Sequence, residues 1–128
     1  MASFINTPLS GAAIVVDLSV DSEVVIGPNG AVFSTITNSI GHTSPLLTSE
    51  TQITVLGTVT ARVNPINIDA DTLVDVNIFV GATGSVVASA DSYTAVFLEG
   101  GEISVMNFGA ISGGFDGVSI RNATSAYF

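Results

Sequence analysis

Glycines recur at a nearly constant interval along the chain, and this repeat constrains the fold more than any other feature. Each glycine opens a short stretch with an aliphatic residue two places on and small residues one and four places on. The four stretches are GAVFS from Gly30, GTVTA from Gly57, GSVVA from Gly84 and GAISG from Gly109, at intervals of 27, 27 and 25 residues. Self-similarity with a period of ~20–50 residues indicates a solenoid, a propeller or a helical array.

The residue types favour a solenoid built of strands. Two residues after each glycine, the aligned units carry Val32, Val59, Val86 and Ile111. Four residues before it, they carry Ile26, Ile53, Val80 and Val105. Val, Ile, Thr, Ser and Gly dominate, and Asp75-Val76-Asn77-Ile78 shows the period-two alternation of a strand. A propeller blade needs ~40 or more residues, which is longer than this repeat.

We therefore predict an all-β, single-domain β-solenoid (a parallel β-helix) over residues 1–128, with about four to five coils and a repeat of about 27 residues. The repeated glycine would form a corner that needs either a positive φ or the absence of a Cβ. A β-sandwich is the alternative, although it does not require matched residue types at a lag of 27 residues. The repeats cover residues 23–128. Residues 1–22 form either an irregular first coil with Ser3 at the glycine position, or an N-terminal cap, which Pro8 favours.

Charge and composition exclude several classes of function. The net charge is −9, with Arg62 and Arg121 as the only cations, so the sequence predicts no binding to nucleic acid, which requires Lys and Arg on the phosphates. No apolar run approaches the ~20 residues of a transmembrane segment, so none is predicted. The apolar stretch Gly11–Val16 follows no basic residue, and no Sec signal is evident. The absence of cysteine excludes disulfides and thiolate metal sites.

The segment VMNFGAISG at 105–113, continued by GVSI at 117–120, resembles repeats of bacterial autotransporter passengers and related large secreted adhesins. The shared pattern is N-x-G-x-I-x-G followed by a second short apolar strand. It covers mainly residues 101–121, with weaker echoes at 53–68 and 78–98. The resemblance implies a parallel β-helix that is exported to the bacterial surface or beyond, for adhesion, matrix formation or display. Two family features, a Sec signal and a membrane-anchoring barrel, have no counterpart here.

Calcium is the one cofactor for which the sequence offers ligands. Asp69, Asp71 and Asp75 lie within seven residues, and Ca²⁺ binds several oxygen ligands. The spacing departs from the EF-hand loop, which has a glycine at its sixth position and a closing glutamate. A solvated turn that leads into a strand is the alternative interpretation.

The carboxylates Glu99 and Glu102 have the residue types of a glycosidase pair. The chain has no Trp, however, and only two Tyr, so aromatic platforms for a sugar are scarce. His42, the single histidine, precedes Ser44 by two residues without an evident third partner for catalysis. We predict that the protein is not an enzyme.

The prediction that follows is a structural protein of the bacterial surface or extracellular matrix. Copies would assemble end to end into filaments by adding strands to open solenoid ends. Phe128 lies 19 residues after Gly109, so with Ser3 as the first corner the joint would leave a gap of about five residues. The predicted interface between copies is formed by Phe4, Ile5, Tyr127 and Phe128. The alternative is an adhesin-type module of a larger surface protein that binds a polysaccharide or a host protein.

Overall fold

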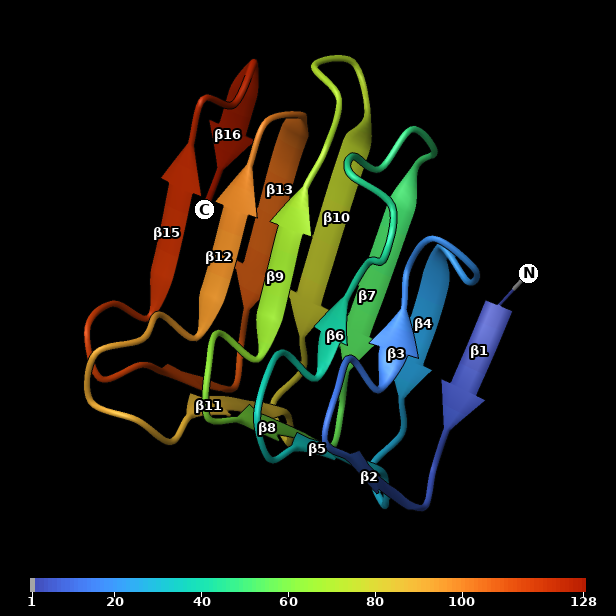
Figure 1. The fold of residues 1–128 in the computed structure, drawn as a ribbon, viewed down its shortest axis with the longest axis vertical. Coiled ribbons are helices and arrows are strands. Elements are labelled where there is room, and N and C mark those ends of the chain that lie inside the picture. Colours follow the sequence, from blue (N-terminus) through green and yellow to red (C-terminus); the bar gives the residue numbers. More distant parts are fainter. Residues whose placement is uncertain (1) are drawn as a thin grey trace.

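The computed structural model describes residues 2–128, and these form a parallel β-solenoid of about five coils (Figure 1). This confirms the fold class predicted from the glycine repeat. All sixteen strands in the described residues pair in parallel, and each coil contributes one strand to each of three sheets. Within residues 2–128, no helix is long and apolar enough to cross a membrane.

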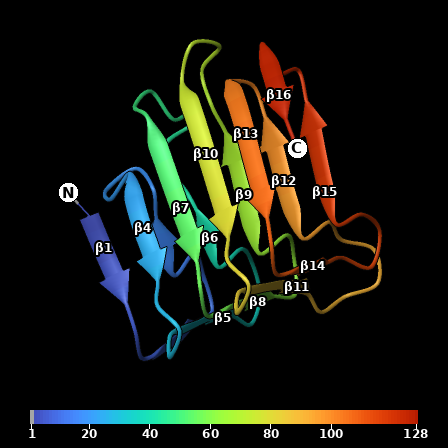
Figure 2. The ribbon, with the colours of Figure 1, turned by 180° about the vertical axis from the view of Figure 1, so that it is seen from behind.

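The three sheets form the three sides of the solenoid. Sheet A, seen best in Figure 2, contains β1 (Ala2–Ile5), β4 (Glu23–Ile26), β7 (Thr51–Val55), β10 (Asp75–Val80), β13 (Glu102–Asn107) and β16 (Ser125–Tyr127). Sheet B contains β2 (Pro8–Gly11), β5 (Ala31–Ser34), β8 (Thr58–Ala61), β11 (Ser85–Ala88) and β14 (Ala110–Ser112). Sheet C contains β3 (Val16–Asp17), β6 (Ile40–Gly41), β9 (Ile66–Asp69), β12 (Val96–Glu99) and β15 (Val118–Arg121).

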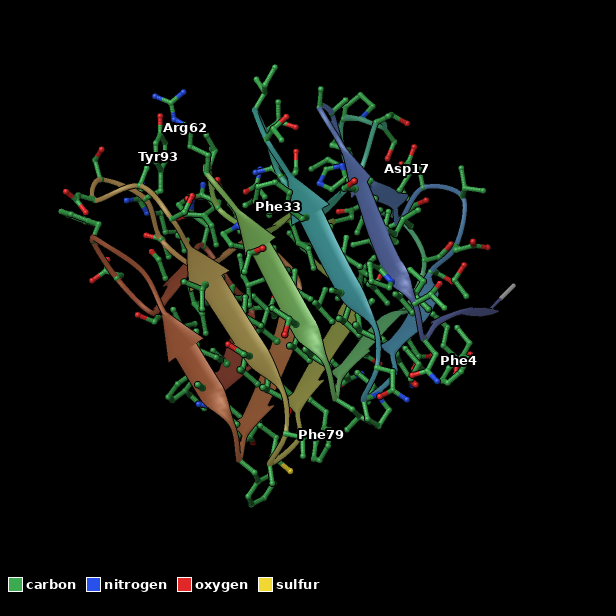
Figure 3. The ribbon with its side chains drawn as sticks, turned by 90° about the horizontal axis from the view of Figure 1, so that it is seen from below. Phe4, Asp17, Phe33, Arg62, Phe79 and Tyr93 are labelled. Atoms are coloured by element: carbon green, nitrogen blue, oxygen red, sulfur yellow. The ribbon has the colours of Figure 1, made fainter. Side chains whose placement is uncertain are left out.

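Columns of aliphatic side chains fill the space between the sheets. The predicted column Val32–Val59–Val86–Ile111 is confirmed, since each residue pairs with the next across sheet B. The first three are fully buried, and burial of such a side chain contributes about 1.5–3 kcal/mol. Residues between the inward positions point out to solvent, as Phe33 does in Figure 3. One continuous core therefore runs along the axis.

The repeated glycines lie at the corner between sheets A and B, and their role is to leave space. Among the described glycines only Gly100 and Gly101, at another corner, have a positive φ. A Cβ on Gly57 would lie 2.2 Å from the carbonyl oxygen of Gly30. A Cβ on Gly84 would lie equally close to the carbonyl oxygen of Val55. The close approach of successive coils, rather than an unusual backbone angle, therefore requires glycine here.

The corner between sheets A and B alternates between two lengths along the stack. It has two residues in coils 1, 3 and 5 (6–7, 56–57 and 108–109) and four residues in coils 2 and 4 (27–30 and 81–84). Each four-residue corner is a turn closed by a backbone hydrogen bond, from the amide of Gly30 to the carbonyl of Gly27 and from Gly84 to Gly81, at 2.8 Å. The structural repeat is therefore a pair of coils.

This alternation corrects the predicted column Ile26–Ile53–Val80–Val105. Ile53 pairs with Val24 and Ile78, whereas Ile26 and Val80 both pair with Val55. The two additional residues in the longer corners shift the strand by two positions relative to the glycine. A shift of two keeps the same face inward, so two separate inward columns look like one in the sequence.

The first coil has a different register from the predicted one. Pro8 pairs with Ala31, which places Thr7, not Ser3, in the column of the corner glycines. Ser3 lies within β1 and pairs with Val24. Residues 2–17 contain β1, β2 and β3, and each of these strands pairs with its counterpart in the second coil.

Candidate assembly interface at the two ends of the solenoid

The N-terminal end exposes one edge of β1, β2 and β3. Each of these strands has a strand partner on one side only. Phe4 projects from the outer face of β1 near this end and is 67% exposed (Figure 3). Ile5 packs partly against the core. Leu9 pairs with the buried Val32 but is itself 43% exposed, so the core column is open here.

The C-terminal end is open in the same way. Ile111 of β14 and Ile120 of β15 are only partly buried, whereas their column neighbours Val86 and Leu98 are fully buried. The end of the solenoid therefore leaves apolar core surface in contact with water. An edge of this kind can accept another strand.

Apolar side chains also gather on the outer face of sheet A at this end. Phe79 and Phe108 pack with ring centroids 5.8 Å apart, and Met106 beside Phe79 is 52% exposed. Tyr127 and Phe128, two of the predicted interface residues, line a shallow depression together with Met106. Phe4 and Ile5 lie at the opposite end of the same sheet. Phe79 and Met106 were not identified from the sequence, although each occupies an outward position in a strand where inward and outward residues alternate.

Strand β16 covers only half of the edge of β13. It pairs with Glu102, Ile103 and Ser104 and leaves Val105–Asn107 without a strand partner on that side. Tyr127, at the register of Ser104, lies in the column that starts with Ala2 in β1. The last and first strands therefore occupy overlapping positions in the coil. The predicted gap of five residues at a joint is wrong, because that prediction placed the first corner at Ser3.

The two ends differ in charge. Arg121, one of the two cations of the chain, lies at the end of β15 with its guanidinium carbon 5.2 Å from the centre of the Phe97 ring. Asp17, Asp21 and Glu23 lie in the first coil and at the start of the second. The last coil therefore carries a cation, beside Glu99 and Asp116, whereas the charged side chains of the first coil are all carboxylates.

Asp17 holds the turns of the N-terminal end together. Its carboxylate accepts hydrogen bonds from the backbone N–H of Ser19 at 2.9 Å and from the hydroxyl of Thr43 at 2.7 Å. Burial acts to raise the pKa of Asp17, but these hydrogen bonds outweigh it and lower the pKa to about 2. The charged carboxylate thus ties the turn after β3 to the loop after β6.

The proposed calcium ligands are spread around one corner. Asp69 lies on β9 beside Glu99 of β12, and Asp75 begins β10 in a different sheet. Asp71 lies between them and accepts a hydrogen bond from the N–H of Thr72 at 2.7 Å. No group of three His, Cys, Asp or Glu side chains that could hold a metal is found within residues 2–128. Calcium binding by these residues stays a prediction.

The residues considered for catalysis have structural contacts. Glu99 accepts a hydrogen bond from the side-chain amide of Asn122 at 3.0 Å, and Glu102 begins a strand of another sheet. Nε2 of His42 accepts the backbone N–H of Asp69 at 2.9 Å, so Nδ1 carries the proton and donates to the carbonyl of Ser44. Because β6 ends at Gly41, the His42 imidazole provides the hydrogen-bond acceptor for the backbone N–H of Asp69 in sheet C.

Comparison with protein-family models, with curated proteins and with solved structures gives no match to this chain.

Proposed function

We propose that this protein is a structural protein whose copies assemble end to end into filaments. The observation that carries the proposal is that the same three parallel sheets present unpaired edges at both ends, with the core columns open between them. A second copy, shifted along the axis, continues every sheet in parallel and covers Ile111 and Ile120. The contact joins two different surfaces and repeats along the solenoid axis, so it produces an open fibre and not a closed ring.

Electrostatics also supports this arrangement. The joint brings Arg121 of one copy toward the acidic N-terminal end of the next. The remaining surface is strongly acidic, since the chain carries a net charge of −9. Like charges keep neighbouring filaments apart at low ionic strength, and salt, divalent cations or acid reduce that repulsion. Lateral bundling is therefore expected to depend on solution conditions more than end-to-end growth does.

The bacterial cell surface or extracellular matrix is the setting we propose for these filaments. The resemblance of residues 101–121 to repeats of autotransporter passengers and secreted adhesins supports this localisation. A chain with no cysteine and a β-solenoid fold suits either an oxidising or a reducing compartment, so composition adds no further constraint.

A second function, glycan binding, is favoured by the outer face of sheet A. Gln52, Asn77 and Ser104 lie side by side in one column, and Phe79 and Met106 lie in the neighbouring outward column. These residues line a shallow depression. Amide groups beside an aromatic ring suit the hydroxyls and the apolar face of a polysaccharide. Asn77→Ala is then expected to abolish retention on a polysaccharide array without a change in thermal unfolding, and unchanged retention would contradict this second function.

Negative-stain electron microscopy of the full 128-residue chain tests the proposed assembly. Samples at neutral and at acidic pH, each with and without calcium, are compared at equal protein concentration. Long fibres one subunit wide are the expected result in at least one condition. Monodisperse particles in every condition, confirmed by light scattering, would exclude filament formation and leave glycan binding as the function to pursue.

A further inference from the structure

We infer, on the basis of the proposed end-to-end assembly, that the free half of the β13 edge is the docking site for β1 of the next copy. In this joint, β16 and the incoming β1 lie end to end along β13 and together form one composite strand. The first two residues of β16, Ser125 and Ala126, keep their place on the first half of β13, whereas Tyr127 moves aside. The incoming β1 takes the second half, at Val105–Asn107, which has no strand partner on that side in a single copy.

The numbers of strands in the sheets favour this joint over a simple stack. Sheet A has six strands, whereas sheets B and C have five each. If β1 of the next copy paired on top of a complete β16, sheets B and C would each be left one strand short at the joint. If β16 and β1 share one position, then β14 meets the next β2 and β15 meets the next β3. All three sheets are then continuous.

The register within one molecule predicts which residues meet. In sheet A, Phe4, Val25, Thr54, Phe79 and Met106 form one outward column. The next position of this column is beside Met106 and belongs to residue 4 of the incoming copy. The joint therefore places the exposed Phe4 of one copy on the exposed Met106 of the other, next to Phe79. Each side chain then covers part of the apolar surface that the other exposes to water in a single copy.

The same register brings opposite charges together in sheet C. Val16, Ile40, Ile66, Val96 and Val118 form one column, so Val16 of the incoming copy pairs with Val118. Asp17 of the incoming copy then lies beside Ser119, two residues from Arg121 on the neighbouring strand. A diagonal pair of this kind is within reach of long side chains.

The overlap between the two chain ends is small. Tyr127 occupies the register of residue 2 of the incoming copy, so Tyr127 and Phe128 leave the strand line when the joint forms. Both side chains are strongly exposed, at 74% and 79%, and β16 has only three paired residues. Little structure is lost by this movement.

The corner of the first coil fits this joint. Thr7 has a Cβ in the column of the corner glycines. The carbonyl oxygens that would clash with a Cβ on Gly57 or Gly109 belong to the four-residue corners below them. At the joint, Thr7 would instead sit on residues 108–109, which form a two-residue corner. Gly30 and Gly84 lie above two-residue corners and would also clash, each with the carbonyl oxygen of the residue before that corner, but both end a four-residue turn. Thr7 ends a two-residue corner, so that turn is absent from the first coil.

A disulfide between copies tests the register. Ser10 and Ser112 share one outward column of sheet B, with Phe33, Thr60 and Val87 between them. Within one copy they are four strand steps apart, about 19 Å, so a disulfide cannot form. In the proposed joint they lie one step apart, at about 5 Å, which suits a disulfide. In a stack on a complete β16 they lie about 10 Å apart, which is too far.

The chain with Ser10→Cys and Ser112→Cys is assembled, oxidised and run on a denaturing gel without reductant. A ladder of covalent multimers that collapses to monomer with reductant is the expected result. The two single variants are the controls, because each places a cysteine opposite a serine and should remain monomeric on the gel. Fibres that form without any ladder overturn the inferred register but leave the proposed filament intact. Absence of fibres even in the natural chain overturns the proposed function itself.

A second disulfide asks whether Tyr127 must leave the strand line. Ser104→Cys with Tyr127→Cys joins two residues that pair directly within one copy, and so fixes β16 in place. Oxidised protein is expected to lose fibre formation, and reduction of the same sample should restore it. The matched control is Gln52→Cys with Asn77→Cys, a directly paired position inside sheet A, where oxidation should leave assembly unchanged. Normal fibres from the oxidised Ser104–Tyr127 variant overturn the inference.

Discussion

Ile68 and Ile120 occupy the same inward column of sheet C, with Leu98 between them, yet their surroundings differ. Ile68 lies in a middle coil and is almost fully buried. Ile120 lies in the last strand of the sheet and is only partly buried. An isoleucine at the same position of the repeat is therefore buried in a middle coil and partly exposed to solvent in the last coil.

This difference shows that adjacent coils along the axis supply the hydrogen bonds and the burial that each residue of the solenoid obtains. A middle coil receives backbone hydrogen bonds and apolar contacts from both sides, whereas an end coil receives them from one side. The middle coils are thus expected to determine the stability of a single copy. The end coils are expected to determine its association with other copies.

Gly57→Ala is expected to have the largest effect, because it breaks the contact between middle coils. The new Cβ would lie 2.2 Å from the backbone oxygen of Gly30 and 2.4 Å from that of Gly27. Overpacking against backbone should destabilise the fold by about 3 kcal/mol or more. Gly117→Ala, near the C-terminal end, has its nearest contact at 3.5 Å and should change stability by less than about 0.5 kcal/mol. Denaturant unfolding of both variants measures this; equal effects would contradict the spatial role of Gly57.

Ile68→Ala and Ile120→Ala compare the two regions directly. Removal of the buried Ile68 side chain should lower the free energy of unfolding by about 2–5 kcal/mol. Ile120→Ala should lower it by less than half as much in a single copy, because part of that side chain already contacts water. In fibres the order changes: Ile120→Ala should raise the concentration of unassembled protein at equilibrium. If Ile120→Ala left that concentration unchanged, the C-terminal end would not be part of the joint.

The parts of the fold that the sequence could predict are those repeated in every coil. The corner glycine and the column of Val59 recur because each coil packs on the next in the same way, so the period and strand class follow from the pattern. The column of Ile53 was misassigned because a two-residue shift preserves the inward face and leaves the same apolar pattern. The first coil was misplaced because it has Thr7 in the glycine position.

The candidate interface was predictable only in part. Tyr127 and Phe128 were predicted from their place at the end of the chain, and Phe4 from its place near the start. Alternation could have identified Phe79 and Met106 as outward residues. Their place in the candidate interface, however, depends on the pairing of β10 with β13 and on the half of the β13 edge that β16 leaves uncovered. These contacts join strands that are distant in the sequence, so a local sequence pattern does not predict them.

Asp17→Asn tests how the N-terminal end is held together. The folded-state pKa of Asp17 is about 2, below its ordinary value of 3.8, so its carboxylate stabilises the fold above about pH 4. That contribution is lost as the pH falls from about 4 through about 2. The difference in melting temperature between the natural chain and Asp17→Asn should therefore shrink over this range. Asp116→Asn, at an exposed loop residue, is the control; a difference that stayed constant with pH would contradict the role of the charged Asp17.

Pro8→Ala is expected to have the smallest effect and to sharpen the comparison at the joint. In the later coils the equivalent residues donate their backbone N–H to the corner glycine of the coil before them: Thr58 to Gly30 at 3.1 Å, and Ser85 to Gly57 at 2.8 Å. Pro8 has no N–H, so the first coil cannot make this bond to the preceding copy. The β2 edge of sheet B therefore pairs less strongly with that copy.

Alanine at position 8 restores the donor. One backbone hydrogen bond contributes about 1 kcal/mol net, so the concentration of unassembled protein at equilibrium should fall about fivefold. Pro28→Ala, in a four-residue corner away from the joint, is the control for the general loosening that follows removal of a proline. If both variants assembled like the natural chain, residue 8 would not face the corner of another copy. The joint would then leave sheet B open, as it does when a complete β16 separates the two copies.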